Sequence, residues 1–141
     1  MKPVFRNDDK IQRLKFRDWF RENMPSGSNG FVVEDLDLVV RWYGRSFDTD
    51  ADGKFILVEL KFGNSTIGIA QQKTFGLIDK LLRLTDPEKK RYLGYFVIQY
   101  SDEDWDKSEF KINGSPISRS DFQDFWKLKH LIPSYFDQEQ P

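Results

Sequence analysis

The stretch from Phe31 to Phe62 reads FVVEDLDLVVRWYGRSFDTDADGKFILVELKF, and it decides the fold class. Its two ends, 31–44 and 55–62, are rich in valine, isoleucine, leucine and aromatic residues, which favours β-strands. The Asp- and Gly-containing segment between them is typical of a connection that reverses the chain. We therefore expect a β-hairpin here.

Alternation of side chains along the two strands predicts which residues share a face of the hairpin. One face carries only apolar side chains, those of Leu36, Leu38, Val40, Trp42, Ile56, Val58, Leu60 and Phe62. The other face has apolar Val39 and Leu57 but also Asp37, Glu59 and Lys61. Apolar residues on both faces imply that both faces are covered. Charges in such strands are costly unless they are paired or bind a metal, so this charged face is the candidate site.

The register of the hairpin decides whether the three charged side chains can meet. They share a face when paired positions sum to an even number. Pairing of Asp37 with Glu59, or of Asp37 with Lys61, meets this condition and leaves a connection of sensible length. Two carboxylates and one ammonium can therefore lie within reach of one another.

The rest of the chain alternates between helical and extended patterns. We expect helices over 8–24, 65–84 and 118–131, a strand over 91–101, and a small hairpin that turns at Asn113-Gly114. Ser65 or Thr66 is the expected N-cap of the second helix, and Ser118 or Ser120 that of the third. The apolar face of the second helix is expected to hold Ile67, Gln71, Phe75, Ile78 and Leu82. The order is thus α-β-β-α-β followed by a hairpin and a helix, which is an α/β class.

This order and three short motifs resemble the PD-(D/E)XK nucleases. The motifs are EDLDLVV (34–40), VELK (58–61) and IAQQ (69–72), although no proline precedes Asp37. The resemblance implies a restriction-endonuclease-like core over about 10–101, with a central mixed sheet flanked by helices. Residues of about 102–141 would then form a C-terminal extension within one domain, 1–141.

The resemblance also implies a metal-dependent phosphodiesterase that cuts nucleic acid, with DNA favoured. Asp37, Glu59 and the backbone carbonyl of Leu60 would hold Mg²⁺ or Mn²⁺, since hard cations take oxygen ligands. Lys61 would position the attacking water and screen the phosphate. Gln71 is the expected helix residue at this centre, because it continues the buried face. The auxiliary candidates are Gln72, Asp35 and Glu22.

The composition sets limits on the function. The absence of cysteine excludes disulfides, thiolate metal sites and a cysteine nucleophile, and fits a reducing compartment. No apolar run reaches membrane-spanning length and the start of the chain lacks a signal-peptide core, so we expect a cytoplasmic protein without a membrane partner. A net charge of -1 counts against a pure DNA-binding module. A homodimer could form through exposed aromatics, for which the candidates are Trp105, Trp126 and Tyr135.

Other interpretations stay open at this point. The segment DTDADGKFILVE (48–59) matches the EF-hand calcium template, with Asp48, Asp50, Asp52 and Glu59 as ligands. The strand-like flanks argue against it, because an EF-hand needs a helix on each side. Glu59 and Lys61 could also be a solvated pair on an edge strand, and the fold could serve as an inactive binding module. His130 is most simply a surface residue.

Overall fold

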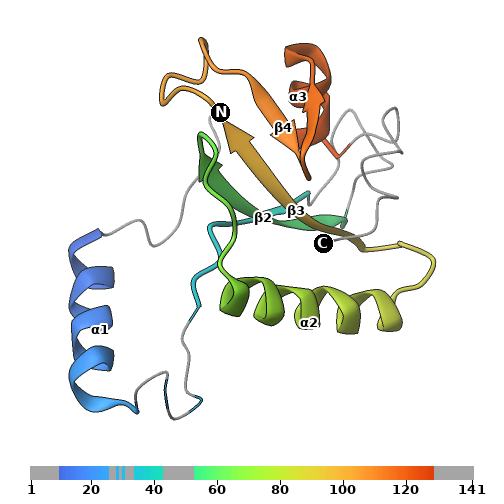
Figure 1. Ribbon diagram of the computed structural model, residues 1–141. Helices are drawn as coiled ribbons and strands as arrows, with labels where there is room; N and C mark the ends of the chain where they lie inside the picture. Colours follow the sequence, from blue (N-terminus) through green and yellow to red (C-terminus); the bar gives the residue numbers. More distant parts are fainter. Residues whose placement is uncertain (1–9, 26–27, 29, 31–33, 43–52, 129–141) are drawn as a thin grey trace. The chain divides into compact units, whose positions relative to one another are not determined.

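The computed structural model describes residues 10–25, 28, 30, 34–42 and 53–128, and the chain divides into two compact units (Figure 1). The first unit, Met1–Val33, contains helix α1 (Lys10–Asn23), which falls inside the predicted range 8–24. The second unit, Glu34–Pro141, contains the sheet and the other helices. That both units belong to one domain stays a prediction.

The second unit is built on a mixed five-stranded sheet, as predicted. Its strands follow the chain in the order β1-β2-β3-β4-β5, and only β2 and β3 are parallel. A parallel pair needs a crossover connection, which here contains helix α2. The bounds are β1 (Leu38–Arg41), β2 (Phe55–Phe62), α2 (Ile69–Thr85), β3 (Tyr92–Tyr100), β4 (Phe110–Ile112), β5 (Ser115–Ile117) and α3 (Arg119–Trp126).

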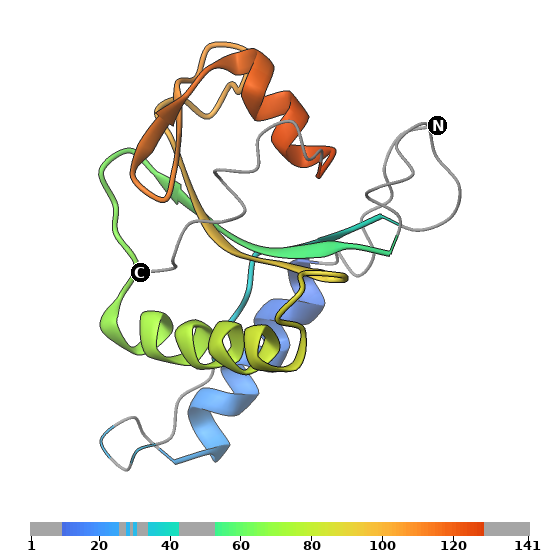
Figure 2. The same ribbon diagram turned by 90° about the vertical axis from the view of Figure 1, so that its right-hand side faces the viewer.

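Helices α2 and α3 lie on opposite faces of this sheet, which gives three layers (Figure 2). Ile56 and Val58 of β2 pack on the α3 side with Phe122 and Phe125. Leu57 of β2 faces the other way and packs with Phe75 of α2, together with Tyr92 and Tyr95 of β3. A strand covered on both faces is apolar throughout, and this accounts for the sequence FILVELKF.

One of the predicted strand-face assignments, that of Leu36, is wrong, and Phe62 lies on its predicted face but is only partly covered. Leu36 precedes β1 and packs with the α2-side cluster, so strand alternation does not extend to it. Phe62, at the end of β2, is 48% exposed. We expected both faces of the hairpin to be covered by other parts of the protein. This is wrong for β1, the edge strand of the sheet, where Val39 is 61% exposed.

The start and the buried face of α2 also differ from expectation. Its N-cap is Gly68, without a side-chain hydrogen bond, and neither Ser65 nor Thr66 caps it. Asp79 is buried where Ile78 was expected, and Ile78 is 38% exposed. Burial of Asp79 is tolerated because the Arg83 Nε donates to its carboxylate at 3.0 Å and the Tyr92 hydroxyl donates at 2.5 Å.

The C-terminal hairpin and helix form as predicted, with a shorter helix. Asn113 and Gly114 both have positive φ angles, 50° and 84°, as a tight two-residue hairpin turn requires. Ser118 is the N-cap of α3, since its hydroxyl accepts the Asp121 N–H at 3.1 Å. The helix ends at Trp126, and the rest of the predicted range beyond Leu128 lies outside the described residues.

The aromatic residues near α3 do not form the exposed surface that was expected of them. Trp105 and Trp126 are partly buried against the α3-side core, and their rings stack on each other at 6.5 Å between centroids. Tyr135 and His130 lie outside the described residues. Across the part of the chain that the structure describes, no helix has the length and apolar character to cross a membrane.

Candidate active site

Asp37 and Glu59 face each other across the β1–β2 hairpin. The register pairs Leu38 with Val58, and its continuation puts Asp37 opposite Glu59, which is one of the two predicted pairings. The Oδ2 atom of Asp37 accepts the backbone N–H of Leu60 at 2.8 Å. This bond holds the Asp37 carboxylate against β2, next to the Glu59 side chain.

Glu59 is the buried centre of the site. Its side chain lies on a central strand and the residue is 4% exposed, so the interpretation as a solvated pair on an edge strand is wrong. Its Oε1 accepts a hydrogen bond from Gln71 Nε2 at 2.8 Å and lies 3.6 Å from the Lys61 Nζ. Its Oε2 is buried without a hydrogen-bond partner. A buried acceptor that lacks a partner is costly, and such an atom suits a site for a cation.

The surroundings of Glu59 disfavour its charged form. Burial raises the pKa of this carboxyl, and the negative charge of Asp37 raises it further. The hydrogen bond from Gln71 and the charge of Lys61 act in the opposite direction and lower the pKa. The net direction is upward, because burial disfavours the charge and two adjacent carboxylates repel each other when both are charged. Either a proton shared with Asp37 or a bound cation would relieve this repulsion.

Tyr95 is a polar residue of the site that the sequence did not reveal as such. Tyr95 pairs with Leu57 on the α2 side of the sheet, two positions along the strands from the pair of Glu59 and Val97. Its hydroxyl is buried without a partner. Burial first, then the negative charges of Glu59, Asp37 and Asp79, raise the pKa of this phenol, which keeps it neutral. Alternation along RYLGYFVIQYS predicts that Tyr95 and Gln99 share a face of their strand. That pattern was the sequence feature that could have identified Tyr95 as a residue of the site.

All three auxiliary candidates are exposed, unlike Glu59. Gln72 is exposed on α2, so the preference for Gln71 agrees with the geometry. Asp35 is exposed and precedes β1. Glu22 is exposed on α1, in the other unit.

The donor set of the site suits a divalent cation with a small number of protein ligands. Among the described residues no group of three or more His, Cys, Asp and Glu side chains could hold a metal. Mg²⁺ keeps several waters and is commonly bound by only one or two carboxylates together with substrate phosphates. Asp37 and Glu59 provide two carboxylates, and the unpartnered Glu59 Oε2 provides an unused buried acceptor. The residues present therefore fit Mg²⁺ or Mn²⁺.

No protein-family model, curated protein or solved structure matches this chain. The chemistry of the site therefore has to be inferred from its own residues and geometry. The geometry supplies two apposed acids, a lysine on the same strand face and a helix amide that fixes one acid.

Proposed function

We propose that the protein is a metal-dependent nuclease of the PD-(D/E)XK type that hydrolyses phosphodiester bonds, most readily in DNA. The observation that carries the proposal is the environment of Glu59, a buried acid beside Asp37 and Lys61 with one oxygen atom unpartnered. Perturbed acids near a specific charge partner are characteristic of functional sites. An acid with a purely structural role would have its oxygen atoms satisfied within the fold.

In this mechanism each residue has a separate task. Asp37, Glu59 and the backbone carbonyl of Leu60 would hold the divalent cation, and the chemistry that it would supply is a bound water of lowered pKa and compensation for the charge of the scissile phosphate. Lys61 orients the attacking water and contacts the phosphate oxygens through its ammonium group. Gln71 fixes Glu59 through its hydrogen bond to Oε1, which leaves Oε2 as the oxygen that would be available to a cation.

The EF-hand interpretation of residues 48–59 has less support. Glu59 belongs to β2, which occupies Phe55–Phe62, where an EF-hand requires the start of its second helix. At about 3.3 Å per residue, Glu59 lies roughly 20 Å along the strand from Gly53 and cannot close around an ion bound in the loop. Asp48, Asp50 and Asp52 all lie outside the described residues.

The first test is direct. Purified protein is incubated with single-stranded, duplex, flap and junction DNA and with RNA, in Mg²⁺ or Mn²⁺. We expect cleavage of at least one DNA form, and EDTA should abolish it because the acids hold the metal. If every substrate stays intact with both metals, the protein is an inactive module on a nuclease-like scaffold.

A second test separates the two candidate metal sites. Glu59→Gln removes a metal ligand and should lower the cleavage rate by about 100-fold or more. Glu88→Gln is the matched control, because Glu88 is an exposed acid that pairs only with Lys90, at 3.0 Å. Replacing Asp48, Asp50 and Asp52 together by Asn should also leave cleavage intact. Loss of cleavage and of tight Ca²⁺ binding in this triple variant alone would favour the EF-hand.

A further inference from the structure

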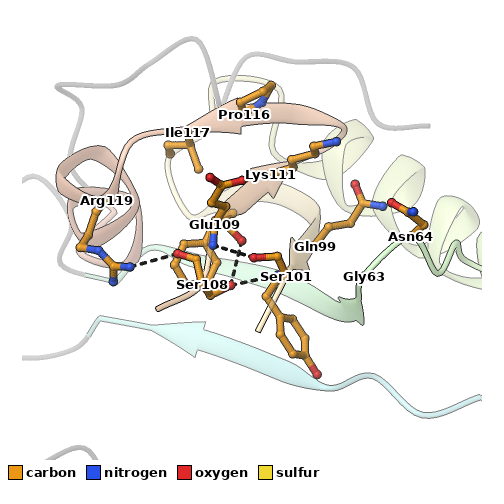
Figure 3. A pocket seen from close by; sticks show the side chains of 12 residues that line it. Gly63, Asn64, Gln99, Ser101, Ser108, Glu109, Lys111, Pro116, Ile117 and Arg119 are labelled. Carbon is orange, nitrogen blue, oxygen red and sulfur yellow. Dashed lines mark hydrogen bonds between the residues drawn. The ribbon is translucent and has the colours of Figure 1, made fainter. Parts of the chain in front are cut away.

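A second polar site lies on the sheet beside the candidate active site. It is a cavity of about 680 Å³ over β3, β4, β5 and the turn that follows β2 (Figure 3). Side chains of Asn64, Gln99, Lys111 and Glu109 border it. Its size is in the range of small-ligand sites in proteins. No residue of this cavity belongs to the acid cluster around Glu59.

The strand register connects this cavity to the active site. Lys61 of β2 pairs with Gln99 of β3, Gln99 pairs with Lys111 of β4, and Lys111 pairs with Pro116 of β5. Paired residues share a face of the sheet, so these four form one row. Adjacent strands are about 4.8 Å apart, which separates the backbones of Lys61 and Lys111 by roughly 10 Å. The row therefore begins at the proposed catalytic lysine and ends in the cavity.

The floor of the cavity is fixed by internal hydrogen bonds. The Arg119 guanidinium donates to the carbonyl oxygens of Trp105, Asp106 and Ser108, at 2.9, 2.9 and 3.0 Å. The Ser108 hydroxyl donates to the Glu109 carbonyl at 2.8 Å. These groups already have hydrogen-bond partners within the segment from Trp105 to Glu109. They leave the binding of a ligand to other side chains.

Lys111 is the charged donor that remains available. It is exposed, and within the described ranges neither it nor Glu109 takes part in an ion pair. The Asn64 amide adds an uncharged donor beside the cavity, as does the Gln99 amide, whose Nε2 also donates to the Ser65 carbonyl at 3.4 Å (Figure 3). Two ammonium groups with amides between them suit successive phosphates of a polymer better than one small anion.

We propose that this cavity binds the sugar-phosphate backbone of the nucleic-acid strand that passes through the active site, with Lys111 on a phosphate near the one at Lys61. The proposal rests on the proposed nuclease function and names a substrate subsite for it. Glu109 borders the same cavity, and its negative charge opposes phosphate binding. Lys111 and Glu109 should therefore have opposite effects on affinity for the strand.

The test measures binding without cleavage. Full-length protein in EDTA is titrated into a labelled single-stranded oligonucleotide at several salt concentrations between about 50 and 200 mM. Lys111→Gln should weaken binding several-fold and reduce the slope of log K against log salt by about 0.7, the value for one lost contact to a single strand. Glu109→Gln should tighten binding. Lys90→Gln is the matched control, an exposed lysine before the other end of β3, and should change neither quantity.

The results separate this proposal from the proposed activity. Wild-type-like affinity and slope in Lys111→Gln, in a protein that still cleaves DNA, would overturn the subsite and leave the nuclease standing. Lys111-dependent binding without cleavage in Mg²⁺ or Mn²⁺ would support the subsite and overturn the enzyme. The strand assignment also fails if the protein does not bind the oligonucleotide. The assignment to a polymer strand fails equally if inorganic phosphate displaces the oligonucleotide at an ionic strength at which chloride does not, because the cavity would then prefer one small anion.

Discussion

Asp86 shows how a single exposed carboxylate can fix a turn. It follows α2, and its side chain accepts the backbone N–H groups of Lys90, Arg91 and Tyr92, at 3.1, 2.8 and 2.8 Å. These bonds, first that of Tyr92 and then that of Arg91, lower the pKa of Asp86. The turn leads into β3, so the carboxylate sets the point at which the central strand begins.

Asp86→Ala should lower the melting temperature because it leaves three N–H groups without their acceptor. Since the folded pKa is lowered, the carboxylate stabilises the fold above its ordinary pKa, and this contribution disappears as the pH falls through the folded pKa. The difference between wild type and variant should therefore be largest near neutral pH and shrink in acid. Melting curves over a pH series measure it. An equal difference at every pH would show that the charge of Asp86 is irrelevant.

Gln71 and Gln72 are adjacent glutamines that allow a matched comparison. Only Gln71 donates to Glu59, and Gln72 is exposed. Removal of a residue that orients a metal ligand commonly costs 10- to 100-fold in metal affinity, so Gln71→Ala should weaken Mn²⁺ binding by about that factor. Gln72→Ala should bind as wild type does. Calorimetric Mn²⁺ titration gives both values. Equal affinities in the two variants would mean that Gln71 has no positioning role.

At the level of elements, two serines near the start of α3 allow a matched comparison like that of the two glutamines. The Ser118 hydroxyl caps the helix through the Asp121 N–H, whereas Ser120 is exposed within the helix. Ser118→Ala should cost about 1 kcal/mol of unfolding free energy, and Ser120→Ala should cost much less. The cost should appear in global unfolding, because Phe122 and Phe125 of α3 belong to the α3-side core. Urea denaturation measures it, and a reversed ranking would contradict the observed cap.

The elements that the sequence predicts well are those with a strong local pattern. β2 was predicted with its exact bounds, since FILVELKF is apolar on both faces and bounded by turn residues. Asn113-Gly114 likewise predicts its hairpin, because few sequences adopt two consecutive positive φ angles easily. Alternation and the length of the connection left two hairpin registers open, and the observed register continues to the pairing of Asp37 with Glu59. Alternation was sufficient to bring Asp37, Glu59 and Lys61 to one face.

The features that were missed depend on tertiary contacts. Asp79 of α2 is buried because Arg83 and Tyr92 donate hydrogen bonds to its carboxylate, and Tyr92 belongs to β3, a distant part of the sequence. The start of α2 at Ile69 leaves Ser65 in the preceding turn, where its N–H donates to the Phe62 carbonyl at 3.2 Å. Local propensity cannot predict such contacts. The row from Lys61 to Lys111 was also hidden, because it needs the pairing of β3 with β4.

At the scale of the whole molecule, the site and the stability of the fold are linked through one pair of charges. The Asp37 charge and burial both raise the pKa of Glu59. For an acid whose pKa is raised on folding, stability falls as the pH rises from its unfolded to its folded pKa. Near neutral pH the raised pKa of Glu59 therefore lowers the stability of the protein without metal. A divalent cation bound between the acids removes the repulsion between them.

Binding to the folded state alone stabilises it by RT ln(1 + [L]/Kd), about 2.7 kcal/mol at a hundredfold excess over Kd. Mn²⁺ should therefore raise the melting temperature of the wild type. Asp37→Asn keeps an oxygen that can accept the Leu60 N–H but removes the charge. Without metal this variant should be as stable as the wild type or more stable, and Mn²⁺ should no longer shift its melting temperature.

Asp35→Asn is the control for this experiment, because Asp35 is an exposed acid two residues away and outside β1. It should keep the full Mn²⁺ shift if Asp37 is the ligand. An acid that only holds the fold together would behave differently, since replacing its carboxylate by an amide would weaken the charge-assisted bond from the Leu60 N–H and lower stability. An Asp37→Asn variant that melts much lower without metal, together with no Mn²⁺ shift in the wild type, would show that Asp37 is structural and that the acid pair holds no cation.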